Sequence, residues 1–273
     1  DVLAKPWNLL FASSFDQGLD AEFADGSPVA HAHHDLAASP DGRSGGGLRI
    51  APNTWLRYTL GDNIDFDLGT LSVWARPDFA PAEGGEARGD NIQYVFAMGV
   101  RTGHRLQCWF DMTADAPRLR LRVGNAEDNH VVGIPIDDWG AGEWRRIQVS
   151  WRAPGHLAFR VGDDAWEERQ DMPLPDLPSA MFYDVYFGTN AVEAERMRLG
   201  RPKRFHGVLD DVRIYRAYKH QTHGEPIAVE SAAIPGDVAA LDPVWVSENR
   251  YRLMLYLDDN EGDWDRRPVS VMI

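Results

Sequence analysis

Short runs in which apolar and polar residues alternate dominate this chain, and turn-forming residues such as Gly, Pro, Asn and Asp bound most of them. Alternation with a period of two is typical of β-strands with one buried face, and helical periodicity is nearly absent. The runs occupy residues 9–15, 47–50, 56–60, 70–76, 94–99, 105–111, 118–124, 144–151, 156–161, 185–188 and 207–215. This many short strands predict an all-β sandwich or barrel.

Alternation also assigns each residue to one face of its strand. In the run at 70–76, Leu71 and Val73 would face the core, so Trp74 and Arg76 would face away from it. If several such strands line one sheet, their outward side chains converge on a concave surface. We predict a ligand-binding surface made of Trp74, Arg76, Gln107, Trp109, Arg120, Arg146 and Gln148. The alternative is a solvated sheet face whose arginines pair with the abundant Asp and Glu.

Composition narrows the class of ligand. The formal charge of −14 argues against a nucleic-acid partner, because phosphate contacts need clustered basic residues. Yet 25 of the 28 basic residues are arginines, which pair with carboxylates and sulfates through a planar fork. Ten tryptophans add rings that fill a core and can stack on flat ligands. Together these features predict an anionic glycan.

Other classes of protein are disfavoured. The single cysteine, Cys108, excludes an internal disulfide framework and a cysteine-based zinc site. No apolar run approaches the 18 residues of a membrane helix, so we predict no membrane span. No basic-then-apolar leader is visible either.

The chain divides into three parts by pattern. Residues 1–218 carry the strand pattern and predict a single sandwich, and residues 219–243 read as a linker. Residues 244–273 predict a β-hairpin extension that is too small for its own core. We expect it either to pack on the sandwich or to begin a further module.

Five motifs appear in a characteristic order along the chain. They are FDQG at residues 15–18, GGGL at 45–48, TLSVWARP at 70–77, WRRIQVSW at 144–151 and GVLDDVRIYRA at 207–217. This order resembles that of the laminin-G-like, concanavalin A-like lectin and glucanase superfamily, over roughly residues 9–218. The resemblance implies a jelly-roll β-sandwich of two antiparallel sheets. It also implies a polysaccharide or glycoconjugate partner and a secreted, periplasmic or cell-surface location. The superfamily includes lectins as well as glycan-degrading enzymes, so the fold alone does not select a function.

Three aspartates are candidate ligands of a metal. Strict alternation in the last run would place Val208, Asp210, Val212 and Ile214 on one face, where an unpaired carboxylate is very costly. Carboxylate and carbonyl oxygens are the ligands that Ca²⁺ prefers. The resemblance implies that the first and last strands meet near a structural calcium, and we therefore predict that ion at Asp16, Asp210 and Asp211. The alternative is that backbone amides and arginines satisfy these carboxylates.

Catalytic signatures are weak. His31 and His33 have the spacing of metal ligands on a strand, but no second ligand pair is identifiable, so a surface loop is the favoured interpretation. The letters G-x-S-x-G around Ser44 lack the flanking strand and helix of a nucleophile elbow. The acidic strand signature of sandwich glucanases is also absent.

Two hypotheses of function follow. The first is a non-catalytic, lectin-like carbohydrate-binding module with a structural calcium. The second is a polysaccharide lyase acting on a uronic-acid polymer, which must neutralise a carboxylate and move a proton. Arg120, Arg146, Gln148 and Tyr186 could take those roles, although no lyase motif is present.

Overall fold

The computed structural model describes residues 8–33, 36–51, 54–83, 91–99, 105–113, 116–124, 129–170, 184–189, 205–219, 244–247, 250–255 and 269–271 of the chain. It divides into two compact units. Asn8–His220 form one unit, and Asp1–Trp7 with Gln221–Ile273 belong to the other. Within the described residues, helix is limited to the 3-10 turns η1 (Gly61–Asn63) and η2 (Pro81–Glu83), and no helix there is long and apolar enough to cross a membrane.

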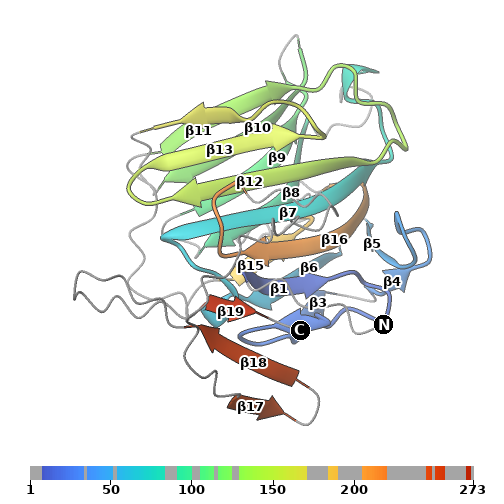
Figure 1. Ribbon diagram of the computed structural model, residues 1–273. Coiled ribbons are helices and arrows are strands. Elements are labelled where there is room, and N and C mark those ends of the chain that lie inside the picture. Colours follow the sequence, from blue (N-terminus) through green and yellow to red (C-terminus); the bar gives the residue numbers. More distant parts are fainter. Residues whose placement is uncertain are drawn as a thin grey trace. The chain divides into compact units, whose positions relative to one another are not determined.

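The first sheet of the larger unit has nine strands, all paired antiparallel. In spatial order these are β14 (Glu167–Arg169), β13 (His156–Val161), β12 (Arg145–Arg152), β7 (Leu68–Pro77), β16 (Gly207–Tyr215), β1 (Leu9–Ser13) and β2 (Phe23–Ala24). In addition, β5 (Gly47–Ile50) pairs with β16 and β4 (Ala38–Ser39) pairs with β5. The first and last strands of this unit, β1 and β16, are therefore neighbours (Figure 1).

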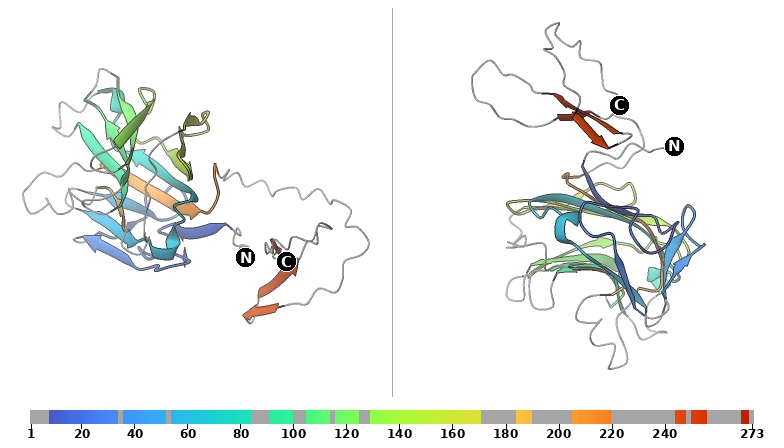
Figure 2. Two further views of the ribbon diagram at one scale, coloured as in Figure 1. Left: turned by 90° about the vertical axis from the view of Figure 1, so that its left-hand side faces the viewer. Right: turned by 90° about the horizontal axis from the view of Figure 1, so that it is seen from below.

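The second sheet has seven antiparallel strands. Their order is β11 (Asn129–Pro135), β10 (Arg118–Gly124), β9 (Arg105–Asp111), β8 (Ile92–Gly99), β15 (Asp184–Phe187), β6 (Trp55–Thr59) and β3 (Ala30–His33). The two sheets lie face to face (Figure 2). Side chains from both form one buried cluster, and the ring of Phe11 on β1 meets that of Tyr58 on β6 at 4.9 Å.

This architecture confirms the prediction of an all-β sandwich with two antiparallel sheets. Every run predicted as a strand is one, within a residue or two at its ends. The strands that the pattern missed are β2, β3, β4, β11 and β14. All five lie at the edge of a sheet, β4 because it pairs only with β5, and edge strands bury too little of one face to impose strict alternation.

Strand β16 corrects one prediction about the faces. Its pairing with β7 shifts between Asp210 and Arg213, and Asp211 has the positive φ of a bulge residue, +47°. Val212 and Ile214 face the core as predicted, but Asp210 lies opposite Trp74 on the outer face. The extra residue in the bulge reverses the alternation, which a strict period of two could not anticipate.

The smaller unit has a sheet of its own, in the order β17 (Val244–Ser247), β18 (Arg250–Leu255) and β19 (Val269–Val271). All three strands lie within residues 244–273, where the sequence pattern predicts a β-hairpin extension. The assignment of residues 219–243 as a linker falls outside the described residues, except for Lys219.

Candidate functional site

The seven predicted ligand-binding residues divide between the two sheets. Trp74 and Arg76 lie on β7 and Arg146 and Gln148 on β12, all in the nine-stranded sheet. Gln107, Trp109 and Arg120 lie on β9 and β10 of the seven-stranded sheet. All seven point away from the core, as alternation predicts. Because the core separates the sheets, however, the two groups occupy opposite faces of the sandwich, and the predicted single groove is wrong.

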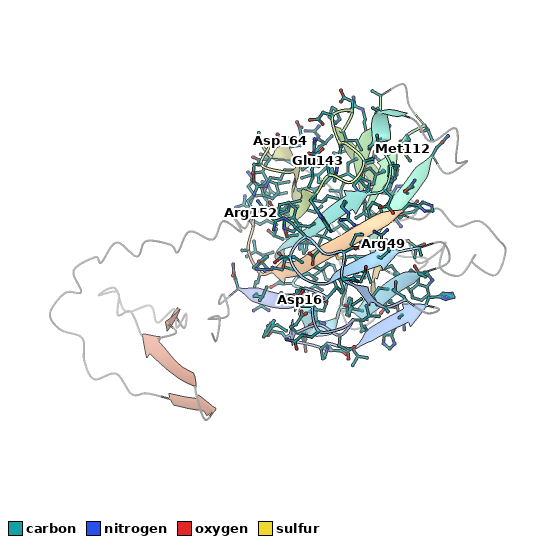
Figure 3. The ribbon with its side chains drawn as sticks, turned by 90° about the vertical axis from the view of Figure 1, so that its right-hand side faces the viewer. Asp16, Arg49, Met112, Glu143, Arg152 and Asp164 are labelled. Atoms are coloured by element: carbon teal, nitrogen blue, oxygen red, sulfur yellow. The ribbon has the colours of Figure 1, made fainter. Side chains whose placement is uncertain are left out.

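Figure 3 shows the larger unit from the side. Arg152, which ends β12, and Met112, which follows β9, are on opposite sides of it. Each sheet therefore presents its own outer surface, and each surface is a separate candidate site.

The outer surface of the seven-stranded sheet carries two rows of paired residues. One row consists of Gly133, Arg120, Trp109 and Tyr94 across β11, β10, β9 and β8, and the next consists of Val131, Arg122, Gln107 and Ala97 on the same strands. We call the surface formed by Tyr94, Gln107, Trp109, Arg118, Arg120 and Arg122 the arginine–aromatic face. Hydrogen-bonded strands lie about 4.8 Å apart, so neighbours within a row can bind one ligand together.

Trp109 is at the centre of this face. The rings of Tyr94 and Trp109 are 5.9 Å apart and tilted by 47°, and the Arg122 guanidinium lies 5.3 Å from the Trp109 ring centroid. Arg120 forms an ion pair with Asp111. Burial opposes ionisation of Asp111, but hydrogen bonds from Thr113 and the charge of Arg120 outweigh it and hold the pKa of this carboxyl below its usual value.

Two polar groups on the arginine–aromatic face have no hydrogen-bond partner or ion pair among the described residues. Gln107 is only 5% exposed, and its Oε1 accepts no hydrogen bond from the described residues. The Nε of its cross-strand neighbour Arg122 is also buried without an acceptor. Buried polar atoms in native proteins are nearly always paired, so an acceptor and a cationic donor side by side indicate a place for a ligand. A group carrying both a hydroxyl and an anionic oxygen would satisfy both.

The same sheet has a second aromatic cluster, which is not among the predicted ligand-binding residues. The rings of Trp55 on β6 and Tyr186 on β15 are 5.6 Å apart, and the His33 ring meets Trp55 edge-on at 4.9 Å. Beside them, Arg57 pairs with Asp184 at 3.3 Å. Alternation in the segment 55–59 could have revealed this cluster, because Leu56 and Tyr58 are core residues and turn Trp55 and Arg57 outward.

The outer surface of the nine-stranded sheet stacks cations on rings. The Trp74 ring has the Arg43 guanidinium 3.8 Å from its centroid and that of Arg146 at 5.6 Å. Further along, Arg160 donates from Nε to Gln148 Oε1 at 2.7 Å and lies 4.5 Å from the Trp166 ring. We call Arg43, Trp74, Arg146, Gln148, Arg160 and Trp166 the arginine–tryptophan ladder. The predicted residue Arg76 lies outside it and stacks on Trp144, at 5.1 Å.

Two of the three predicted metal ligands, Asp210 and Asp16, anchor a loop. Asp210, 2% exposed, accepts hydrogen bonds from the backbone N–H groups of Arg43 at 2.7 Å, Ser44 at 3.3 Å and Asp211 at 2.6 Å. Asp16 accepts one from Gly46 at 2.6 Å. Burial raises the pKa of the Asp210 carboxyl, and the amides of Arg43, Asp211 and Ser44 oppose that rise. The segment 41–46 thus closes over the outer face of β16 through two carboxylates.

Glycines make this close approach possible. Gly45 has a φ of +84°, in the left-handed region that glycine adopts at no steric cost. A Cβ on Gly46 would lie 2.3 Å from the carbonyl oxygen of Phe15. The letters around Ser44 therefore belong to a loop that two aspartates hold in place, and no helix follows them.

The surroundings of these three carboxylates do not fit a calcium ion. Asp211 Oδ1 accepts from Arg213 Nε at 2.6 Å, so N–H groups approach all three carboxylates. Nowhere in the described ranges do three His, Cys, Asp or Glu come together as metal ligands would. Calcium requires six to eight oxygen ligands. The amide-capped alternative accounts for the buried Asp210 without a cation, and we favour it over the predicted calcium ion.

A melting experiment decides the calcium question. Because the amides already satisfy Asp210, we expect the same Tm in millimolar calcium and in excess chelator. Differential scanning fluorimetry of the whole chain measures it. A higher Tm in calcium that disappears in Asp210→Ala would instead establish the metal site.

The residues considered for a lyase are also separated. Arg120 and Tyr186 lie on the seven-stranded sheet, and Arg146 and Gln148 on the nine-stranded sheet. Four groups on opposite faces cannot act on one sugar. The favoured loop interpretation of His31 and His33 was wrong, because both lie on edge strand β3.

Comparisons with known proteins find similarity of structure only. No protein-family model matches the chain, and no curated protein sequence matches it significantly. Domain 4 of AbnA, an extracellular arabinanase from Geobacillus stearothermophilus solved with arabinotriose, is similar with a TM-score of 0.51 and 14% identity, over 77% of this chain and 94% of that one.

Two toxin structures are similar to a comparable degree. The structure of botulinum neurotoxin type C, a toxin whose cell entry depends on interaction with two ganglioside molecules, has a TM-score of 0.55 and 10% identity. The binding domain of Paraclostridial Mosquitocidal Protein 1 has a TM-score of 0.52 and 14% identity. Each match covers 78% of this chain but only 49% and 50% of the two toxin chains. At these identities the comparisons support the β-sandwich fold and leave function to the site.

Proposed function

We propose that this chain is a non-catalytic carbohydrate-binding module that holds an anionic polysaccharide on the arginine–aromatic face. The observation that carries the proposal is the buried, unpartnered pair of Gln107 Oε1 and Arg122 Nε beside the Trp109 ring. Aromatic rings stack on the apolar faces of sugars, and guanidinium groups pair with carboxylates or sulfates. The face supplies both within two adjacent rows.

The structurally similar proteins support the carbohydrate-binding part of this proposal. One neighbour is an arabinanase domain in complex with arabinotriose, and another is a toxin whose cell entry depends on interaction with two ganglioside molecules. The laminin-G-like motif order points the same way and favours a jelly-roll topology with a secreted or cell-surface location. The anionic character of the glycan rests on this chain's own arginines.

The first test is removal of one charge from the face. Arg122→Gln should weaken binding of an acidic polysaccharide about 10- to 100-fold, since a charge-assisted hydrogen bond contributes about 1.5–3 kcal/mol. Affinity gels and calorimetry with alginate, a sulfated uronan and a neutral arabinan provide the measurement. Arg152→Gln is the matched control, because Arg152 lies on β12 of the other sheet and stacks only on Tyr218 among its described contacts.

Three results would contradict the proposal in whole or in part. If Arg122→Gln and Arg152→Gln bind the acidic polysaccharide with equal affinity, the ligand does not bind on the arginine–aromatic face. Growth of the ultraviolet absorbance of an unsaturated uronide on incubation with a uronan would make the chain a lyase. Tighter binding of neutral arabinan than of alginate would remove the anionic part of the proposal and keep the glycan part.

A further inference from the structure

The arginine–tryptophan ladder buries two like charges next to each other. Arg146 on β12 and Arg160 on β13 are 7% and 6% exposed. They occupy the outer face of adjacent strands, with Gln148 directly opposite Arg160. Two guanidiniums removed from water in this way repel each other and lose hydration, and both effects cost free energy unless a negative charge compensates them.

The nearby carboxylate leaves Arg160 poorly compensated. Asp163 pairs with Arg146 at 3.3 Å, but its side chain is 82% exposed, and solvent screens such a pair. Arg160 itself forms no ion pair with a described residue. Burial, and then repulsion by Arg146, lower the pKa of Arg160, which is consistent with a cation that lacks full compensation.

One donor of Arg160 also lacks an acceptor. Its Nε is used by Gln148 and its π face by Trp166, while Nη2 is buried and makes no hydrogen bond to the described residues. An N–H of a buried guanidinium is among the most costly groups to leave unpaired. What this position needs is an acceptor that also carries negative charge.

We infer that an oxyanion group, a carboxylate or a sulfate, binds between Arg146 and Arg160 on the outer face of the nine-stranded sheet. The group accepts from Arg160 Nη2 and neutralises both guanidiniums. Gln148 holds Arg160 through its Nε, and Trp166 covers one side of that guanidinium. This site is on the opposite side of the sandwich from the arginine–aromatic face and does not depend on the proposed function of that face. A module with both sites can hold acidic groups of two chains at once.

Anion-dependent melting tests the site. In sodium sulfate or sodium glucuronate, the Tm of the whole chain should exceed its Tm in sodium chloride of equal ionic strength by about 2–4 °C, since ligand binding to the folded state stabilises it. Arg160→Gln removes the charge and the fork and should abolish this difference. Its Tm in chloride should be unchanged or higher, because the repulsion of Arg146 is gone. Arg152→Gln, which removes an exposed arginine of the same sheet outside the site, should keep the full anion-dependent shift.

The outcomes separate the sources of the anion and the two proposals. A shift with glucuronate but not sulfate identifies a sugar carboxylate, and the reverse identifies a sulfate group. Either supports the site. If Arg160→Gln keeps the shift, the shift reflects general salt effects and the proposed site is overturned. The site is also overturned if the wild type shows no shift. A chain that loses polysaccharide binding in Arg122→Gln and still shows the Arg160-dependent shift supports both proposals, and each can fail without the other.

Discussion

Asp210→Ala is expected to lower the free energy of unfolding by about 2–4 kcal/mol, because it leaves three backbone N–H groups without their acceptor. These are the amides of Arg43, Ser44 and Asp211, which Asp210 binds while almost fully buried. Denaturant unfolding followed by tryptophan fluorescence measures the change. The loss stays moderate because the variant also removes the cost of burying a charge.

The pH dependence of this effect has a defined sign. Burial raises the pKa of the Asp210 carboxyl in the folded protein above its value in the unfolded chain. As pH falls from neutral, the folded state takes up this proton first, and the wild type gains stability relative to the variant. The difference between the two proteins should therefore be larger at about pH 4 than at about pH 7.

Asp16→Ala is the matched control for Asp210→Ala. Asp16 holds the same loop through one amide, that of Gly46, and lies at an exposed position. We expect it to cost about 0.5–1.5 kcal/mol, the net contribution of a single hydrogen bond. Equal losses in the two variants would show that the buried amide cluster around Asp210 does not stabilise the fold as argued.

Trp109→Ala should have the largest effect on glycan binding. The ring is 6% exposed, packs against Tyr94 and supports the Arg122 guanidinium, so its removal leaves Tyr94 without its aromatic neighbour and releases the cation beside it. Together these losses correspond to about 2–3 kcal/mol, or a 30- to 150-fold weaker Kd. Calorimetry with the tightest-binding acidic polysaccharide from the gels measures it.

Trp144→Ala controls for the general effect of losing a tryptophan. Trp144 also stacks on an arginine, Arg76, but it is half-buried where Trp109 is buried, and it precedes β12 in the nine-stranded sheet. Its replacement should leave the Kd within about threefold of the wild type. Similar losses of affinity in both variants would indicate that binding responds to stability and not to a ligand on the arginine–aromatic face.

The order of alternating runs was enough to predict the fold class. Residues such as Leu71, Val73, Leu121 and Val149 face the core because a sandwich removes one face of each strand from water. Every run therefore alternates apolar with polar residues. The outward direction of Trp74, Trp109, Arg120 and Arg146 followed from the same rule. Edge strands β3 and β11 escaped it because they bury less.

The grouping of those outward residues was decided by the tertiary structure alone. Alternation shows which face of its strand a residue occupies, but strand order across the sheets depends on pairings between segments far apart in the sequence, such as β16 with β7. For that reason Trp109 and Arg146 both point outward from their strands, as alternation predicts, and yet lie on opposite sides of the core. The bulge at Asp211 acted in the same way, since one extra residue turned Asp210 from the core face to the loop that it anchors.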